Sequence, residues 1–240
     1  MTNAIEHVVI IGGTSGIGLA AAKRLAGEGM KVTIAGRDRD RLAAASAALA
    51  GKADARALDA SDAAQVREFF GTLGAFDHLV LALGSSRGTG AFATLDLTDV
   101  RRGFEEKVWP HLSCAQAALP TIRKDGSITF ISAVSAEMAA PGTAGIAAAN
   151  GALAIVTPIL AAELRPLRVN AVSPGVVDTP WWDFLAADRR QAAFAAYAGM
   201  SPVGRVGTPD DIAKAIAFLI ADSFVTGHVL TCDGGLRLAA

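Results

Sequence analysis

Short apolar runs alternate along the chain with longer alanine-rich segments whose apolar positions recur with a helical period. The runs are nearly continuous, which is typical of parallel strands that helices cover on both faces. This alternation predicts a single α/β domain over residues 1–240, built on a doubly wound parallel sheet of about seven strands. The predicted strands are 7–11, 31–35, 78–82, 127–131, 168–172 and 228–232, and the predicted helices are 16–29, 38–50, 62–73, 98–123, 144–165 and 209–221. Ser61 and Thr208 are expected to cap two of the helices.

Residues 176–207 do not follow this alternation. They are rich in aromatic and small residues, and irregular segments of this length inside a compact domain usually have a function. We therefore expect a loop that forms a lid over a substrate. Apolar side chains are expected to surround that substrate, which favours a small apolar molecule, although packing of the lid on itself would also explain them; these side chains are Trp181, Trp182, Phe184, Met138 and Met200.

The composition excludes several classes of function. The chain carries 22 basic and 23 acidic residues and a formal net charge of −1, so it has no electrostatic basis for binding nucleic acid or an anionic membrane. Cys114 and Cys232 lie far apart, and no cluster of His, Cys and acidic residues has metal-ligand spacing. The first residues lack the basic region of a signal peptide, and no apolar segment is expected to span a bilayer. These features predict a soluble cytoplasmic protein without a metal.

The stretch IIGGTSGIG joins the first predicted strand to the first predicted helix. Gly12 permits a tight turn, Gly16 lets the backbone approach a pyrophosphate, and Gly18 lets the helix pack closely on the sheet. The N–H groups at the helix N-terminus attract phosphate. In this strand–turn–helix context the pattern predicts a Rossmann-type dinucleotide site, to which the remaining residues of the turn also contribute: Thr14, Ser15 and Ile17.

The end of the second predicted strand indicates which dinucleotide is bound. Gly36 leaves the strand tip without an acidic side chain, and Arg37 follows it, where a guanidinium can pair with a 2′-phosphate. Asp38 and Asp40 are the alternative, because an acidic residue about twenty positions after the glycines is a mark of NAD sites. The first turn of a helix, however, favours acidic residues in any case. We interpret Arg37 as the specificity residue and NADP(H) as the cofactor.

These motifs, their order and the stretches RVNAVSPGVVDT (168–179) and VTGHVLTCDGG (225–235) resemble the short-chain dehydrogenase/reductase family over essentially the whole chain. The resemblance implies adenine contacts from Asp59 and Ala60 and a nicotinamide contact from the backbone of Val177. It also implies a homo-oligomer, a tetramer or a dimer, paired through the helices at 98–123 and 144–165. Further cofactor contacts are implied at Gly84, Asn150, Pro174, Gly175 and Thr179.

The catalytic positions of the family carry different chemistry in this sequence. By the resemblance, Ile146 stands where a tyrosine delivers the proton, and Asn150 stands where a lysine lowers the pKa of that tyrosine. The serine position is Ala133, with Ser132 beside it. The helix asparagine position is Lys107, so the asparagine and lysine of the family look exchanged.

Four residues are therefore candidates for catalysis. Lys107 would be a general acid if desolvation lowered its pKa, although a lysine on a helix is equally often a solvated charge. Glu137 follows the fifth predicted strand, beside the expected substrate, where burial would keep a carboxylic acid protonated. Ser132 and Asn150 complete the set. Tyr197, the only tyrosine, is interpreted as an anchor of the lid.

Our leading hypothesis is an atypical NADP(H)-dependent oxidoreductase that transfers hydride to a small apolar carbonyl or activated alkene without the usual tyrosine acid. The alternative is a catalytically silent NADP(H)-binding sensor or partner subunit. Consumption of hydride distinguishes these two hypotheses, whereas nucleotide binding alone does not.

Overall fold

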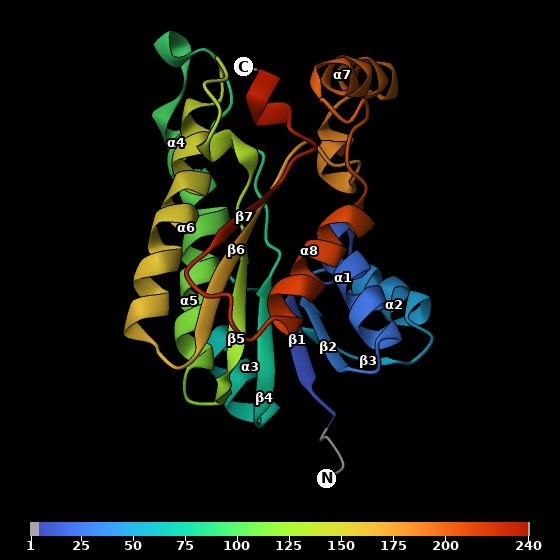
Figure 1. Cartoon of the computed structure of the whole chain (residues 1–240), viewed down its shortest axis with the longest axis vertical. Helices are drawn as coiled ribbons and strands as arrows, with labels where there is room; N and C mark the ends of the chain where they lie inside the picture. The colour runs from blue at the N-terminus through green and yellow to red at the C-terminus, as the bar shows by residue number, and fades with distance from the viewer. Residues whose placement is uncertain (1–4, 240) are drawn as a thin grey trace.

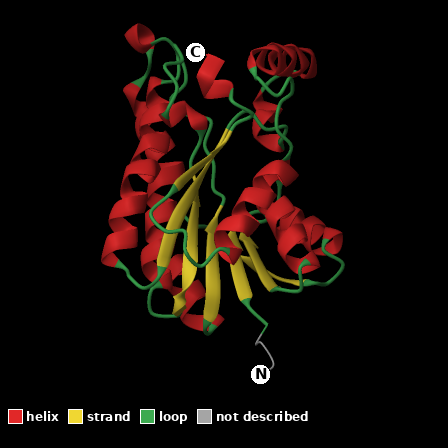
Figure 2. Cartoon of the chain, in the orientation of Figure 1, coloured by secondary structure: helices red, strands yellow, loops and turns green. Residues whose placement is uncertain are grey.

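The computed structural model describes residues 5–239. Seven strands form one sheet in the order β3-β2-β1-β4-β5-β6-β7, and all neighbouring strands are parallel. Figure 2 shows the sheet between two layers of helices, so the predicted doubly wound fold is confirmed. The strands are β1 (His7–Ile11), β2 (Lys31–Gly36), β3 (Ala53–Ala57), β4 (Phe76–Leu81), β5 (Ile122–Ile131), β6 (Arg168–Pro174) and β7 (Val229–Cys232).

Helices cover both faces of the sheet (Figure 1). One face carries α1 (Gly16–Gly27), α2 (Arg39–Ala48) and α8 (Pro209–Ala221), and the other carries α3 (Ala63–Leu73), α5 (Trp109–Ala118) and α6 (Ala144–Glu163). Successive side chains of a strand point to opposite faces. In β1, Val8 and Ile10 accordingly join the core under α1 and α8, whereas Val9 and Ile11 join the core under α3 and α5. All four are buried, which explains why the strand is apolar throughout.

The strand β3 has no counterpart among the six runs that the hydrophobic pattern predicted. Its sequence, ADARA, contains no β-branched or aromatic residue, and it lies at an open edge of the sheet with part of its surface exposed. Such an edge strand buries few apolar side chains, so the hydrophobic pattern of its sequence predicts a strand only weakly. The helix that follows begins one residue later than expected, because the carboxylate of Asp62, rather than Ser61, caps it. Thr208 caps α8 as predicted.

The helix predicted over 98–123 is interrupted. It begins as α4 (Leu97–Gly103), continues through a π-helical turn at Phe104–Val108, resumes as α5 and ends at Ala118, and β5 begins at Ile122. Pro110 accounts for the interruption, because it has no N–H to donate and its ring crowds the carbonyl four residues earlier. The same turn carries Lys107.

The segment 176–207 was expected to be a loop, and this expectation is wrong for its second half. A short 3-10 turn at Pro180–Phe184 is followed by the helix α7 (Ala187–Met200), which has no fully buried residue. Figure 1 shows α7 beyond the carboxyl ends of the strands. The apolar residues of α7 are interspersed with polar and charged residues that hide its helical period. The second half of the segment is therefore mainly helical.

The helix α6 also departs from expectation. It is long and apolar enough to span a bilayer by length and composition, contrary to our prediction for the sequence. A core helix of a soluble protein can be equally long and apolar. Here α6 packs on β6 and β5, and its Leu153 is completely buried, so the core explains the apolar residues on one side of the helix, whereas Ile155 and Ile159 on another side are exposed.

Candidate active site

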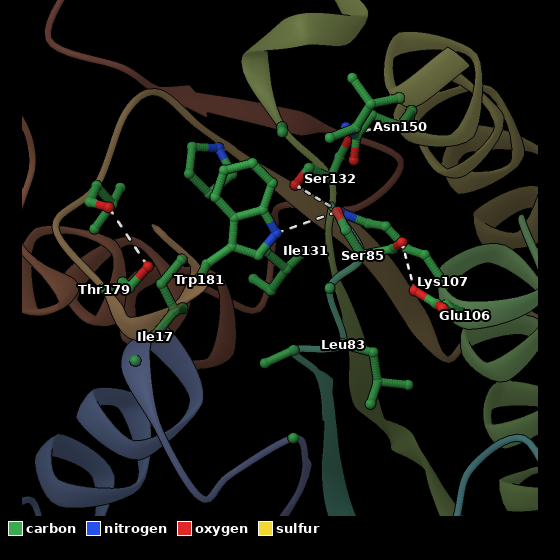
Figure 3. Close-up of a pocket in the computed structure, with 18 of the residues that line it drawn as sticks. Ile17, Leu83, Ser85, Glu106, Lys107, Ile131, Ser132, Asn150, Thr179 and Trp181 are labelled. Carbon is green, nitrogen blue, oxygen red and sulfur yellow. Dashed lines mark hydrogen bonds between the residues drawn. The ribbon is translucent and has the colours of Figure 1, made fainter. Parts of the chain in front are cut away.

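A cleft of about 810 Å³ lies at the carboxyl ends of the strands. The sheet reverses its winding between β1 and β4, because β1 is followed by α1 on one face and β4 leads to helices on the other. The connecting loops diverge there and open a crevice in which ligands of such folds bind. Side chains from segments far apart in the sequence meet in this crevice, and Figure 3 shows Ile17, Lys107 and Asn150 among them.

The glycine loop approaches the neighbouring backbone so closely that side chains are excluded. A Cβ on Gly12 would lie 2.5 Å from the carbonyl oxygen of Ala82, and Gly12 has a φ of +83°. A Cβ on Gly18 would lie 2.2 Å from the oxygen of Gly12. Each glycine is therefore required by packing, and the loop presents backbone rather than side chains to the cleft. This is the cradle that a pyrophosphate requires.

Almost all of the predicted cofactor residues line this one cleft. Gly18 is the exception, because it serves the packing of α1 rather than the surface of the cleft. The other predicted residues come together from the ends of β1, β2, β3, β4 and β6 and from α6. They are Gly12, Thr14, Ser15, Gly16, Ile17, Arg37, Asp59, Ala60, Gly84, Asn150, Pro174, Gly175, Val177 and Thr179.

Two guanidinium groups lie at the end of the cleft beside β2. Arg37 lines the cleft and has no hydrogen-bond or ion-pair partner among residues 5–239. Asp38 caps α2, and its carboxylate accepts a hydrogen bond from Nε of Arg41 at 3.0 Å. These bonds hold the pKa of Asp38 below its ordinary value. The carboxylate of Asp38 thus already accepts hydrogen bonds from the N-terminus of α2 and from the side chain of Arg41. Arg41 also lines the cleft, although no motif in the sequence singled it out.

Asp59 lies opposite these cations at the end of β3. Its carboxylate accepts hydrogen bonds from the hydroxyl and the backbone N–H of Ser61, at 2.6 and 3.0 Å. These two bonds, with the nearby charge of Arg37, keep the pKa of Asp59 below its ordinary value. Asp59 is therefore a fixed anionic acceptor at this end of the cleft.

Lys107 lies at the other end of the cleft and is only 6 % exposed. Its Nζ donates a hydrogen bond to the backbone oxygen of Ser132 at 3.3 Å. Burial lowers the pKa of Lys107 to about 8, because no carboxylate compensates the loss of water around the ammonium. The alternative that Lys107 is a solvated charge on a helix surface is thus wrong. The cleft contains a desolvated amine that can hold or release a proton near neutral pH.

Ser132 and Asn150 form the wall beside Lys107. The hydroxyl of Ser132 donates to the backbone oxygen of Asn150 at 2.9 Å, so this hydroxyl is engaged within the fold. The amide nitrogen of Asn150 donates to the hydroxyl of Ser135 at 3.0 Å. Its amide oxygen is buried and accepts no hydrogen bond from the described residues. A buried acceptor of this kind is costly unless a ligand or water satisfies it.

The remaining candidates separate into two groups. Ile146 and Ala133 line the cleft, where they present hydrocarbon to its interior. Glu137 does not line the cleft; its carboxylate accepts a hydrogen bond from Thr231 at 3.1 Å and pairs with Arg237 at 3.4 Å. The expectation that Glu137 lies beside the substrate is therefore wrong, because β7 and the C-terminal turn offer this carboxylate better partners than the apolar cleft.

Aromatic residues of the segment 176–207 line the cleft. The indole of Trp181 reaches across it, between Thr179 and Ile17 on one side and Ser85 on the other (Figure 3). Its Nε1 donates to the backbone oxygen of Ser85 at 3.1 Å. The rings of Trp181 and Trp182 meet edge to face with centroids 4.9 Å apart. Trp182, Phe184, Met138 and Tyr197 line the cleft as well, whereas Met200, which was expected there, does not.

One polar pair in the cleft was missed by the sequence analysis. The hydroxyl of Ser85 donates to a carboxylate oxygen of Glu106 at 2.7 Å, and the other oxygen of Glu106 lies 3.5 Å from Nε of Arg87. Ser85 follows the glycine of the β4 loop, and Glu106 precedes Lys107 in the π-helical turn. No local sequence signal relates the two positions, because only the packing of the π-helical turn against this loop brings them together.

Comparison with known proteins gives the family. The family model described as enoyl-(acyl carrier protein) reductase matches residues 12–237. An uncharacterized oxidoreductase of Methylorubrum extorquens is 36% identical over 243 residues, which cover 95% of this chain and 96% of the relative. The short-chain dehydrogenase/reductase ATR9 of Stachybotrys chlorohalonatus is 33% identical, and 97% of each chain is covered.

Solved structures agree with these sequence relatives. A small-chain dehydrogenase crystallised in complex with NADPH superimposes with a TM-score of 0.87 at 35% identity, and 98% of this chain and 100% of that chain are covered. The chain belongs to the short-chain dehydrogenase/reductase family of oxidoreductases. The resemblance inferred from the sequence motifs is thereby confirmed.

The buried amine of Lys107 gives a prediction about stability. Its folded-state pKa of about 8 lies below the ordinary 10.5, so between these pH values the unfolded chain binds more protons and stability rises with pH. We expect Lys107→Met to be more stable than the wild type at pH 7 by about 3 kcal/mol from this effect. That advantage should shrink as the pH rises from 8 towards 10.5.

Urea unfolding at a series of pH values measures this difference directly. Lys52→Met, at an exposed lysine, is the matched control. Its unfolding free energy should differ from that of the wild type by an amount that does not shrink between pH 8 and 10.5. A stability difference at Lys107 that stays constant from pH 7 to 10.5 would contradict the buried, desolvated amine.

Proposed function

We propose that this protein is an NADP(H)-dependent oxidoreductase that reduces a small apolar carbonyl or activated alkene, with Lys107 in place of the tyrosine acid of its family. The observation that carries the proposal is the buried amine of Lys107 in the same cleft as the glycine loop. By the resemblance of the sequence motifs to the family, the tyrosine and lysine positions are Ile146 and Asn150, and neither side chain can transfer a proton near neutral pH.

The residues of the cleft suit the proposed cofactor. The glycine loop presents bare backbone, with a Cβ on Gly12 excluded by the carbonyl oxygen of Ala82. The unpaired guanidinium of Arg37 suits a 2′-phosphate. A related solved structure is described as a complex with NADPH, and another, 26% identical with a TM-score of 0.88, as ElxO with NADP bound. When bound, the nicotinamide supplies the hydride.

In this proposal the residues of the chain manage the proton and the substrate. Lys107 keeps two N–H groups free after its bond to Ser132. One of them donates to the oxygen of the substrate and transfers its proton as negative charge develops there. An amine whose pKa is about 8 is well matched to this task near neutral pH. Asn150 offers a buried acceptor oxygen to a hydroxyl of the cofactor or the substrate.

The substrate side of the cleft is apolar. Ile146, Met138 and Ala140 line one wall, and the indoles of Trp181 and Trp182 line the lid. A sugar or a charged acid would lose hydration there without gaining comparable hydrogen bonds. This wall supports a small apolar substrate with one polar atom that reaches Lys107.

One observation favours a second function, a catalytically silent NADP(H)-binding protein. By the resemblance of the motifs, the four positions Ala133, Ile146, Asn150 and Lys107 all differ in chemistry from the catalytic residues of the family, although the glycine loop and the other proposed cofactor residues are kept. The loss of a positioned acid commonly slows a reaction by a factor of about 10² to 10⁴. If no hydride leaves NADPH with a broad panel of apolar carbonyls and enones, this second function is the correct one.

The proposal also covers the localisation, oligomeric state and partners of the protein. We propose a cytoplasmic homo-oligomer, a tetramer or a dimer, with no nucleic acid, membrane or metal partner. No group of three metal-binding side chains occurs within residues 5–239. The outer face of α5 and α6 exposes large apolar side chains that water would otherwise contact, among them Trp109, Ile155 and Ile159.

The first prediction concerns nucleotide preference. NADPH should bind at least about tenfold more tightly than NADH, because a charge-assisted pair with the 2′-phosphate contributes about 1.5–3 kcal/mol. Arg37→Ala should remove most of this preference. Calorimetric titration with both nucleotides measures it. Arg39→Ala, which removes an exposed arginine outside the cleft, is the matched control. Equal affinities of the wild type for both nucleotides would exclude this assignment.

The second prediction concerns the acid. With a carbonyl or enone that the wild type reduces, Lys107→Met should lower kcat at least tenfold and leave the Kd for NADPH largely unchanged. Stopped-flow measurement of NADPH oxidation gives the rate of hydride transfer. Lys52→Met serves again as the control substitution. Full activity of Lys107→Met would show that another group supplies the proton.

The third prediction concerns assembly. Light scattering at micromolar concentration should give the mass of a dimer or tetramer of the 24.5 kDa chain. Charged substitutions at both Ile155 and Ile159 should shift the mass towards the monomer, because they would be placed in a desolvated interface. Arg39→Glu, a charge change on the exposed α2, should leave the mass unchanged. A monomeric wild type would refute this interface.

A further inference from the structure

The imidazole of His111 lies directly behind Lys107 and is completely buried. Its Nδ1 lies 2.7 Å from the backbone oxygen of Lys107. Its Nε2 lies 2.9 Å from the backbone oxygen of Leu81. One ring thus joins the π-helical turn to the last residue of β4. These two carbonyl groups are 26 positions apart in the sequence.

The location of these two carbonyl groups gives the contact its significance. Lys107 belongs to the π-helical turn created where Pro110 interrupts the helix, and π-helical turns are irregular segments that often occur at functional sites. Leu81 precedes Ala82, whose oxygen lies against Gly12 of the glycine loop. The ring therefore fixes the turn that carries the amine relative to the loop that would hold the cofactor.

His111 can do this without adding a charge. Burial and the nearby ammonium of Lys107 lower the pKa of His111 to about 3, so the ring is neutral near pH 7 and its single N–H donates to one of the two carbonyl groups, while the other carbonyl lies against the ring nitrogen without a proton. A second cation beside Lys107 would repel it. The face of the ring packs near Phe130, with centroids 6.0 Å apart and planes tilted by 44°, so apolar packing holds the ring in place.

We propose that His111 is a positioning residue for Lys107: its buried ring fills the space between the backbone of Lys107 and β4 and donates one hydrogen bond there, and this tie holds Nζ inside the cleft at Ser132. The proposal rests on the proposed role of Lys107 as the acid. A long lysine side chain on a loosened turn would instead extend towards water, as lysines near a surface commonly do. The tie therefore sets the burial of Nζ and, through it, the pKa of Lys107.

The charged groups on the elements around Lys107 are few. The π-helical turn itself carries Glu105 and Glu106, and Glu106 is engaged by Ser85 and Arg87. On α5, the other titratable side chain facing the core is Cys114, whose pKa burial raises to about 12. The wall formed by Ser132, Ser135 and Asn150 has no ionisable group. The pKa of Lys107 consequently responds to its burial rather than to a counter-ion.

The experiment measures the pKa of Lys107 in the whole protein by NMR of lysine labelled with ¹³C at Cε. The chain has six lysines, and the signal absent from Lys107→Met assigns the one of interest. In His111→Leu, which removes both polar contacts, we expect the pKa of Lys107 to rise by one unit or more. His111→Gln, which retains an amide donor, should restore much of the wild-type value.

Phe130→Leu is the matched control, because it disturbs the packing around the ring and leaves its hydrogen bonds intact. It should leave the pKa of Lys107 within a few tenths of the wild-type value. If His111→Leu does not fold, His111→Asn takes its place, because its shorter side chain cannot reach both carbonyl groups. A folded His111→Leu or His111→Asn in which Lys107 titrates as in the wild type would overturn the proposal.

Failure of the proposed function has a different result in the same measurement. If Lys107 of the wild type titrates at its ordinary value, the amine is not desolvated and the proposed acid is wrong. If Lys107 titrates near 8 in the wild type and is unchanged by the loss of the His111 contacts, only the positioning role is wrong.

Discussion

The parallel pairing of β1 with both β2 and β4 is the constraint on which the other features depend. Their register aligns the carboxyl ends of the central strands at one edge of the sheet, where the chain must turn away in different directions. The glycine loop, the arginine after β2 and the loop after β4 occupy this edge because their strands end there. The opposite edge has no such divergence. A single pairing pattern thus decides where chemistry can occur in this fold.

The sequence predicted those features that depend on local rules. A strand buried on both faces must be apolar, and a loop that excludes a Cβ must contain glycine, so β1 and Gly12 were recognisable at once. Features that depend on long-range packing were not. The strand β3 is an edge with little burial, and the contact of Ser85 with Glu106 exists only because two distant segments pack together. Glu137 was misplaced because its partners, Thr231 and Arg237, lie about a hundred positions away.

The burial of Lys107 illustrates how a fold can tolerate an unfavourable group at a functional position. A desolvated ammonium without a counter-ion opposes folding, and a structural core would contain a hydrocarbon side chain there. Asn150 has a similar character, because its buried oxygen lacks a donor. Both groups line the same cleft: Nζ of Lys107 has N–H groups left after its bond to Ser132, and the amide oxygen of Asn150 lacks a donor. A hydroxyl can accept from Lys107 and donate to Asn150, whereas a carbonyl can only accept from Lys107, so the polar atoms of this wall select how a ligand is oriented.

Pro110 adds a different kind of control to this arrangement. Proline lacks an N–H group by its covalent structure, so no rearrangement of neighbouring side chains can convert the turn at Phe104–Val108 into a regular α-helix. Pro110, three positions further along the chain, therefore contributes to the direction in which Lys107 leaves the helix, together with the contacts of His111. Replacement of that proline would let the helix close into a regular spiral and rotate the amine out of phase with the cleft, even though every residue that lines the cleft would be unchanged.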